Sequence, residues 1–579
     1  DAVEETDQGI PWMERAIEQH DDNAAAILGV YLVETPKEDC HEEERRHRGF
    51  LLLRSSALEG DLEDHLRIQA LFELGHCYYY GIGTETNIEE AYTWYARAAE
   101  SGSESAQYLT ASLILDKRCS ETDTAKAIAW LRQAAEQGCM YSTMRLGECY
   151  LEGNVVPKDA EEAFQWFQKS AELGNPAAVN MVGRCYMDGN GVEQDQEKAF
   201  QYFQKASEAG DESAMFNLAD CYFNGLGTEQ SEEQAVPWYQ KAAEANISIA
   251  QYMLGTCYHF GKGVSPNEEL ALHWLRKAAE QDYVGAQYAL GTLLFRNEDS
   301  GENDAEAVRW LERAAELGDI GSQVKLGVCY QDGYNVLEQG KVCFKEDMEK
   351  AVELFQNAAE QGDAEGQFQL ANSYRFGLGV KKNVPKMLYW LRLSAMQGYA
   401  EAQYALGICY QDGIGVKADI EKAMDWYERS AAQNYPDAIC SVGMYYLDEE
   451  DDVETAKRLV YKAAQMDCLE AQYLMGMFLY EGDDSEEDEE AVAWFRMAAR
   501  YQNHGGAMGM LGYCYMNGTG VEQDDEMARV WLKRAAECRD YDAIELLKNY
   551  YMIDDYDDFE YEDYGDEPEY DEEDDDWED

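Results

Sequence analysis

Apolar residues recur along most of this chain with the period of an α-helix, in short segments separated by glycines. In one clear example, Ala250, Leu254 and Tyr258 recur every four positions and therefore share one face of a helix. Gly261 interrupts this segment, because glycine readily adopts the positive φ at which helices end. A second apolar stripe, which contains Trp274, follows it. The pattern predicts two antiparallel helices, neither of which can bury its apolar stripe alone.

This helix pair repeats with a period of 36 residues. Two sets of equivalent positions show the period, one in each helix. The second helices carry Trp94, Trp130, Trp166, Tyr202, Trp238, Trp274 and Trp310, then, after a step of 44 and smaller irregularities, Leu354, Trp390, Trp426, Leu459, Trp494 and Trp531. The first helices carry Gly75, Ala111, Gly147, Gly183, Ala219, Gly255, Gly291, Gly327, Ala371, Gly407, Gly443, Gly476 and Gly512. The two sets run in step and predict thirteen stacked units.

The unit resembles the Sel-one-like repeat, a relative of the tetratricopeptide repeat. The resemblance rests on an Ala-x3-Leu-Gly-x2-Tyr block, a Gly-x-Gly-Val loop and a Lys-Ala-x2-Trp-Tyr-x-Lys-Ala-Ala-Glu helix, with good copies at Ala402–Ala431 and Ala178–Ala206. It implies an all-α fold, a right-handed superhelical solenoid of stacked antiparallel helix pairs. It also implies an adaptor or scaffold, without fixing the partner.

Departures from the repeat define the expected organisation of the chain. Trp12 opens a helix that has lost its partner, and the unit after Gly327 has about eight extra residues. That insertion is either a tolerated surface loop or part of a binding face. We expect degenerate repeats over 1–64, regular repeats over 65–332, an insertion loop over 333–347, regular repeats with a C-terminal capping helix over 348–552, and a disordered acidic tail over 553–579.

Helical geometry separates a core face from a candidate binding face on the first helices. With the Gly/Ala position as zero and 100° per residue, positions −5, −1 and +3 share one direction and are expected inside. Positions −3, +1 and +4 share another, which by analogy with tetratricopeptide arrays lines the concave side. Aromatic side chains there suit a peptide groove, although a ring at −3 could instead pack between units. The candidate partner-binding residues are Phe216, Phe223, Tyr252, His259, Tyr288, Phe295, Phe368, Arg375, Tyr404 and Tyr473, with 216–295 favoured.

The formal net charge of −69 narrows the range of partners. It argues against nucleic acid and against anionic membranes, and no apolar run is long enough to span a bilayer. From Asp554 to Asp579, 18 positions are acidic and none is basic, which predicts either a solubilising tail or an electrostatic lure. We expect a scaffold that binds a protein, one with a basic segment being the best match. The alternative is an acidic chaperone, or a buffer of cations or basic proteins.

Neither the cysteines nor the histidines indicate catalysis or a cofactor. Eight of the fifteen cysteines occupy position +2, too far apart for mutual disulfides if equivalent atoms in stacked units are roughly 10 Å apart. They are expected to be core thiols in a reducing, cytoplasmic compartment, a secreted effector being less favoured. The Gly-x-Gly stretches lack a preceding strand and a Walker lysine, so they are interpreted as turns. No catalytic, cofactor-binding or metal-binding residues are expected.

Overall fold

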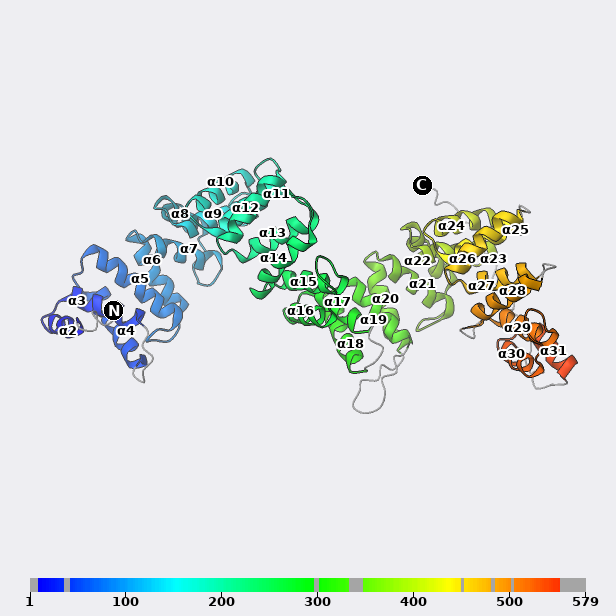
Figure 1. Ribbon diagram of the computed structural model, residues 1–579. Coiled ribbons are helices and arrows are strands. Elements are labelled where there is room, and N and C mark those ends of the chain that lie inside the picture. The colour runs from blue at the N-terminus through cyan, green and yellow to red at the C-terminus, as the bar shows by residue number, and fades with distance from the viewer. Residues whose placement is uncertain are drawn as a thin grey trace. The chain divides into compact units, whose positions relative to one another are not determined.

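The computed structural model describes residues 9–35, 42–295, 301–332, 347–448, 452–480, 485–500 and 504–551. Within these ranges every regular element is an α-helix, which confirms the all-α prediction. The chain divides into two compact units, Asp1–Ala286 and Gln287–Asp579 (Figure 1). Most of the predicted insertion loop, residues 333–346, and the whole predicted acidic tail lie outside the described residues.

The N-terminal segment contains one lone helix and one helix pair. Helix α2 (Ile10–Glu18) leaves Trp12 71% exposed, in keeping with a helix that has lost its partner. Helices α3 (Asp22–Glu34) and α4 (Glu42–Glu59) pack together, and Gly29 permits this, because a Cβ there would come within 2.9 Å of the Leu53 side chain. That this pair is a degenerate copy of the repeat stays a prediction from the sequence.

In the described residues thirteen helix pairs follow, and the last described element is a single helix. In the first unit the pairs are α5 (Asp64–Tyr80) with α6 (Ile88–Glu100), α7 (Glu104–Leu115) with α8 (Thr124–Glu136), α9 (Met140–Glu152) with α10 (Ala160–Glu172), α11 (Pro176–Asp188) with α12 (Gln196–Glu208), α13 (Glu212–Asn224) with α14 (Glu232–Glu244), and α15 (Ser248–Phe260) with α16 (Glu268–Glu280). Helix α17 (Val284–Phe295) begins at the end of this unit, and α18 (Gly301–Glu316) follows it. The second unit continues with α19 (Ile320–Asp332) and α20 (Met348–Glu360), α21 (Ala364–Phe376) and α22 (Val384–Met396), α23 (Ala400–Asp412) and α24 (Ile420–Ala432), α25 (Pro436–Asp448) and α26 (Val453–Gln465), α27 (Leu469–Tyr480) and α28 (Ser485–Ala498), α29 (Gly505–Asn517) and α30 (Asp525–Glu537), and finally α31 (Tyr541–Tyr551).

Glycine and polar caps set the ends of these helices. Helix α23 ends at Gly413, whose φ of 75° gives the left-handed conformation of a helix C-cap. The side chain of Asp419 begins α24 by accepting a hydrogen bond of 3.1 Å from the backbone N–H of Lys422. The second glycine of the loop allows close contact with the preceding repeat. Gly227 lies so close to the preceding repeat that a Cβ there would overlap the carbonyl oxygen of Gln196. The Gly-x-Gly stretches are therefore tight turns within a repeat that pack against the preceding repeat.

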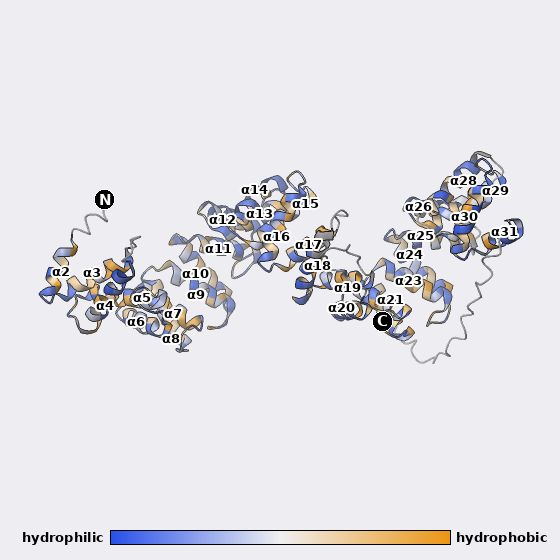
Figure 2. Cartoon of the chain, turned by 90° about the horizontal axis from the view of Figure 1, so that it is seen from below, coloured by the Kyte–Doolittle hydropathy of each residue, from blue (hydrophilic) through white to orange (hydrophobic). Residues whose placement is uncertain are grey.

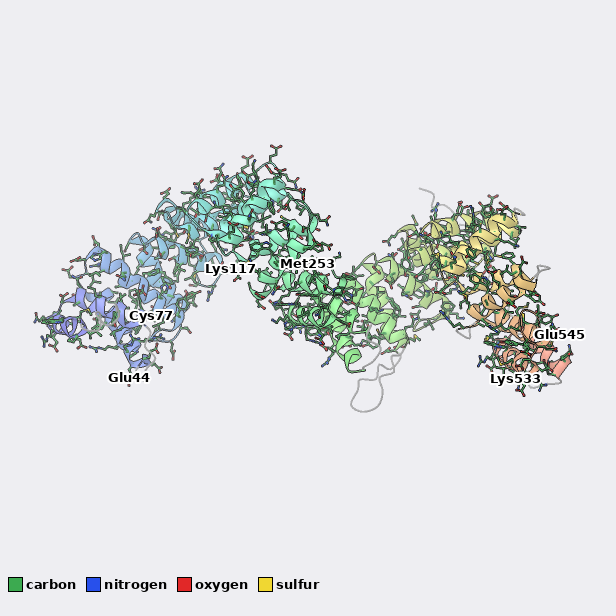
Figure 3. All side chains as sticks on the ribbon, viewed as in Figure 1. Glu44, Cys77, Lys117, Met253, Lys533 and Glu545 are labelled. Carbon is green, nitrogen blue, oxygen red and sulfur yellow. The ribbon has the colours of Figure 1, made fainter. Side chains whose placement is uncertain are left out.

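Each pair buries small and apolar residues between its helices and against the next pair. Hydrophobic and hydrophilic positions alternate along each helix (Figure 2). The cysteines at position +2 belong to this core: all eight are buried, and Cys77, labelled in Figure 3, is 0% exposed. Position −5 is occupied by small, buried residues such as Ala250. At Gly366, the same position of α21, a Cβ would come within 2.7 Å of Ala358 on α20, so this position packs against the preceding pair.

Side chains at position +3 are less buried than we predicted. Tyr186, Tyr374 and Tyr410 occupy this position and are only half-buried. A lysine from the second helix of the same pair lies over each ring, as Lys386 does over Tyr374 at 5.1 Å from the ring centroid. The helical wheel gave the right direction, but tyrosine is long enough for its hydroxyl end to reach the surface.

A glutamine at position −4 joins consecutive helices by hydrogen bonds. The Nε2 of Gln403 on α23 donates to the carbonyl oxygen of Ala395 on α22 at 3.1 Å. Its Oε1 accepts a hydrogen bond of 2.9 Å from Gln433, which follows α24. We call this arrangement the glutamine staple. The same staple is formed by Gln107 with Ala99 and Gln137, Gln251 with Ala243 and Gln281, Gln323 with Ala315 and Gln361, and Gln367 with Ala359 and Gln397.

Candidate protein-binding surface

The ten predicted partner-binding residues lie on the first helices of the pairs. They are Phe216 and Phe223 on α13, Tyr252 and His259 on α15, Tyr288 and Phe295 on α17, Phe368 and Arg375 on α21, Tyr404 on α23 and Tyr473 on α27. Tyr288 is 37% exposed, and the other nine are half-buried. The first four belong to the first unit and the other six to the second, so the candidate surface consists of two sets.

In the first unit, two of the rings rest on one buried tyrosine. The centroids of Phe216 and Phe223 lie 5.9 Å and 6.0 Å from that of Tyr239 on α14, which is 0% exposed. The ammonium of Lys262 lies 5.3 Å from the centroid of Phe223. The rings at positions −3 and +4 of α13 therefore form one aromatic surface, and Tyr239 on the second helix of the same repeat packs against both of them.

Further along the first unit, the ring at −3 reaches the next repeat. Tyr252 on α15 contacts Tyr283, which directly precedes α17, with ring centroids 5.2 Å apart. Tyr283 occupies position −8 of its own repeat, in the turn before the first helix. The ring at −3 thus packs between repeats while part of it stays at the surface, so the two alternatives for this position do not exclude each other.

The second unit repeats this contact with closely similar spacing. Phe368 on α21 lies 5.5 Å from Tyr399, and Tyr404 on α23 lies 5.4 Å from Tyr435, measured between ring centroids. Tyr399 and Tyr435 both occupy position −8 of the following repeat and are half-buried. These two pairs form an aromatic row across the first helices of three consecutive repeats.

Position −6 of the following repeat lies beside the ring at −3. In α19 this position is Gly321, where a Cβ would come within 3.1 Å of the Tyr288 ring. In α29 it is Gly506, where a Cβ would come within 3.3 Å of the Tyr473 ring. Glycine at −6 therefore makes room for the ring. Any larger side chain at this position must extend alongside the ring.

In α23 and α25 position −6 is acidic. Glu401 accepts a hydrogen bond from the hydroxyl of Tyr399, and the hydroxyl of Tyr435 bonds to Asp437. Burial raises the pKa of both tyrosines, and these carboxylates raise it further because phenolate beside carboxylate is unfavourable. Burial also raises the pKa of Glu365, the acid at −6 of α21, with added repulsion from Asp363 and Glu401.

The side chains at position +4 pack mainly along their own helices. His259 contacts the neighbouring Phe260, with ring centroids 4.5 Å apart. The guanidinium of Arg375 lies 5.2 Å from the centroid of Phe376. Phe260 and Phe376 are themselves exposed. These two contacts are local, so His259 and Arg375 contribute less to the inter-repeat surface than we expected. Phe295, by contrast, packs against a core cluster that includes Leu326 of the following repeat.

Sequence reasoning missed the residues at −8 and −6. Tyr399 and Tyr435 are 36 positions apart, a signal that the repeat analysis could have found. They lie in the turn before the first helix, however, and a helical wheel assigns directions only to helical positions. Their contact with the ring at −3 depends on how consecutive repeats are rotated, which the wheel does not contain.

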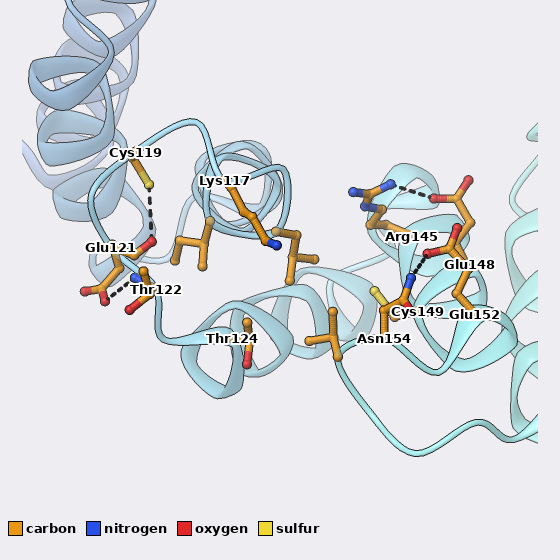
Figure 4. Close-up of a pocket in the computed structure, with 13 residues that line it drawn as sticks. Lys117, Cys119, Glu121, Thr122, Thr124, Arg145, Glu148, Cys149, Glu152 and Asn154 are labelled. Atoms are coloured by element: carbon orange, nitrogen blue, oxygen red, sulfur yellow. Dashed lines mark hydrogen bonds and ion pairs between the residues drawn. The ribbon is translucent and has the colours of Figure 1, made fainter.

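A separate pocket of about 600 Å³ lies in the first unit (Figure 4). It lies beside the loop between α7 and α8, which has no Gly-x-Gly sequence. Arg145 from α9 lies at its edge, bonded to Asp116 and, at 3.0 Å, to Glu148. Burial raises the pKa of the two lining thiols, Cys119 and Cys149, so neither is an activated nucleophile. The arrangement has no pairing of an activated nucleophile with a base.

Comparison with known proteins identifies the repeat. A family model of the Sel1 repeat matches twelve stretches of the chain: 68–103, 105–139, 141–175, 176–211, 212–247, 248–283, 284–319, 320–363, 364–399, 400–435, 469–500 and 506–540. The chain belongs to the Sel1 repeat family. Sel1 repeat proteins are generally protein–protein interaction scaffolds and typically have no enzymatic activity. The pair α25/α26, at 436–468, lies outside the twelve matches yet folds as a helix pair.

A solved structure with an SLR fold is similar to most of this chain. The protective antigen c5321 of uropathogenic Escherichia coli, which displays an SLR fold, is 29% identical, with a TM-score of 0.58. The match covers 80% of this chain and 94% of the antigen. A Sel1 repeat protein from Oxalobacter formigenes is also 29% identical over 54% of this chain and 88% of its own, with a TM-score of 0.41. None of the curated protein sequences compared with the chain matches it significantly.

Proposed function

We propose that this Sel1 repeat protein is a scaffold that binds a protein or peptide partner along the first helices of its repeats. The observation that carries the proposal is the set of partly exposed aromatic rings at position −3, most of which contact a neighbouring ring. Rigid aromatic side chains at a surface supply contact area at low entropic cost, which is typical of protein-binding sites. None of the described helices has the length and apolar character that crossing a bilayer requires.

The alternative function is that of an acidic chaperone or buffer, and the net charge of −69 favours it. The two functions differ in their response to salt. Contacts made through aromatic surface persist at moderate ionic strength, whereas capture by charge alone weakens as the Debye length falls from about 30 Å at 0.01 M to about 8 Å at 0.15 M.

The test is affinity capture with mass spectrometry from cells of the source organism, washed at low and at moderate salt. The baits are the wild-type chain, a chain that ends at Met552, and a variant with Tyr252→Leu and Tyr288→Leu. Leucine keeps apolar volume between the repeats and removes the exposed ring. The control bait carries Tyr389→Leu and Tyr461→Leu, two exposed tyrosines on second helices.

A scaffold retains a defined partner at moderate salt with the wild-type, truncated and control baits, and loses it with the Tyr252/Tyr288 variant. A mixture of basic proteins that disappears with salt or with the tail supports the alternative. Equal capture by the Tyr252/Tyr288 variant and its control would exclude the exposed rings at these two positions as the binding surface.

A further inference from the structure

In the second unit, acids occupy position −6 beside the aromatic row, whereas position −6 is not acidic in the repeats of the first unit. The carboxylate near the rings of the first unit, Asp220, lies at position +1 instead, where it accepts a 3.5 Å hydrogen bond from the hydroxyl of Tyr239. The row in the second unit consists of Phe368 with Tyr399 and Tyr404 with Tyr435, and the acids at −6 are Glu365, Glu401 and Asp437. We call these seven residues the acidic aromatic stripe. In the first unit the equivalent ring pair, Tyr252 with Tyr283, has Gly285 at position −6. The same scaffold therefore presents one aromatic pair without an acid and two with acids.

The acids of the stripe form no ion pair among the described residues, although Lys325 lies near enough to Glu365 to offset part of the rise in its pKa. No ion pair of the described chain includes Glu365, Glu401 or Asp437. Glu401 and Asp437 instead accept hydrogen bonds from neutral groups, such as the thiol of Cys468 at 3.1 Å from Asp437. Glu365 and Glu401 lie on consecutive repeats and repel each other. A cation bound here would relieve that repulsion.

The rings of the stripe also lack a cation of their own. Elsewhere in the chain lysines and arginines cover aromatic faces, as Lys386 does over Tyr374 and Arg429 over Trp426. In the part of the chain that the structure describes, no lysine or arginine lies over Phe368, Tyr399, Tyr404 or Tyr435. A half-exposed tyrosine beside an unneutralised carboxylate matches a guanidinium or ammonium, which gains both a cation–π contact and an ion pair.

We propose that the acidic aromatic stripe binds an extended basic peptide segment, one arginine or lysine per repeat. Equivalent positions in stacked repeats are roughly 10 Å apart by helix-packing distances. An extended chain advances about 3.3 Å per residue, so basic residues about three positions apart match the repeats. The inference rests on the proposed scaffold function and adds the chemistry and location of the partner segment.

The probe is a fluorescein-labelled 13-residue peptide with arginine at every third position and Gly-Ser spacers, measured by fluorescence anisotropy at 0.15 M NaCl with the full chain. A second peptide has the same composition with its arginines contiguous. The stripe variant carries Glu401→Gln and Asp437→Asn. The control variant carries Asp425→Asn and Glu428→Gln, two exposed acids on α24 that change the net charge equally.

We expect the stripe variant to weaken binding of the spaced peptide about tenfold and the control variant less than about twofold. Tyr404→Leu, with its fold checked by circular dichroism, is expected to weaken binding about threefold to fivefold through the lost cation–π contact. Equal losses in the stripe and control variants, equal affinity for the spaced and contiguous peptides, or no binding of the spaced peptide would each overturn the inference.

This experiment and the capture experiment can fail independently. In one outcome the Tyr252/Tyr288 variant loses a captured partner while the stripe variant binds the arginine peptide with unchanged affinity. That result supports the scaffold and rejects a basic segment at the stripe. Equal capture of the partner by the Tyr252/Tyr288 variant and its control rejects the proposed scaffold surface itself.

Discussion

The glutamine staple makes a quantitative prediction at Gln403. This side chain is 6% exposed, and it bonds to the buried Ala395 carbonyl and to the exposed Gln433. Gln403→Leu keeps similar volume and removes both hydrogen bonds. The Ala395 oxygen still accepts a 3.0 Å bond from the backbone N–H of Gly398, so it does not become an orphan. At about 1 kcal/mol net per hydrogen bond, the free energy of unfolding should fall by about 2 kcal/mol.

The matched control is Gln433→Ala, which removes only the exposed partner and should cost less than about 1 kcal/mol. In a repeat array stability is local, so the readout is native-state hydrogen exchange followed by mass spectrometry. Protection should fall in α22, α23 and α24 for Gln403→Leu and change little for the control. A double-mutant cycle between the two positions should show coupling of about 1 kcal/mol. Equal effects of the two single changes, or zero coupling, would refute the staple as a stabilising contact.

Three further predictions concern other parts of the repeat. Gly227→Ala should destabilise its loop by more than about 2 kcal/mol, seen as a lower thermal midpoint, because its φ of 70° and its contact with the preceding repeat both exclude a Cβ; an unchanged midpoint would contradict this. Burial and the adjacent Glu34 raise the pKa of Glu73 to about 7, so stability from this group is present below pH 4.5 and lost as the pH rises to 7. Glu73→Gln should therefore raise stability at pH 8 by about 1–3 kcal/mol in denaturant titrations and leave it unchanged near pH 4; the opposite sign would refute the carboxyl pair. Burial raises the pKa of Cys257 to about 11, so iodoacetamide at pH 8 should label the exposed Cys538 in the native chain and Cys257 only after unfolding.

The repeated fold could be predicted because its signals are local. The glycine at 255 and its equivalents, with the tryptophan of each second helix, recur at fixed spacing and report helix ends and a buried stripe. Even the pair at 436–468 was predicted, although Leu459 replaces the tryptophan there. The prediction needed only helical period and glycine's freedom at positive φ.

The candidate surface was less predictable because it depends on contacts between repeats. The direction of Tyr404 followed from the helical wheel, but its contact with Tyr435 depends on the rotation from one repeat to the next. The sequence shows the glutamines of the staple 36 positions apart, at 367 and 403. It does not show their hydrogen-bond partners, because the acceptor of Gln403 lies on the neighbouring helix. The period of the sequence shows which residues are equivalent. Which of them contact one another follows only from the packing of the repeats.

The staple also bears on how such an array can change length. Gln367 bonds to the carbonyl of Ala359, and Gln403 to that of Ala395, so in both cases the acceptor lies five residues before the start of the staple's own repeat. Removing residues 364–399 as a block would leave Gln403 facing Ala359, an identical acceptor in an identical place. Duplicating the block would likewise create one complete new staple. Whole repeats can therefore be gained or lost by recombination without new compensating substitutions. Length changes confined to a loop also keep the staple, as Gln323 and Gln361 show across the unit with extra residues, whereas a deletion that ends inside a helix would move the glutamine away from its acceptor.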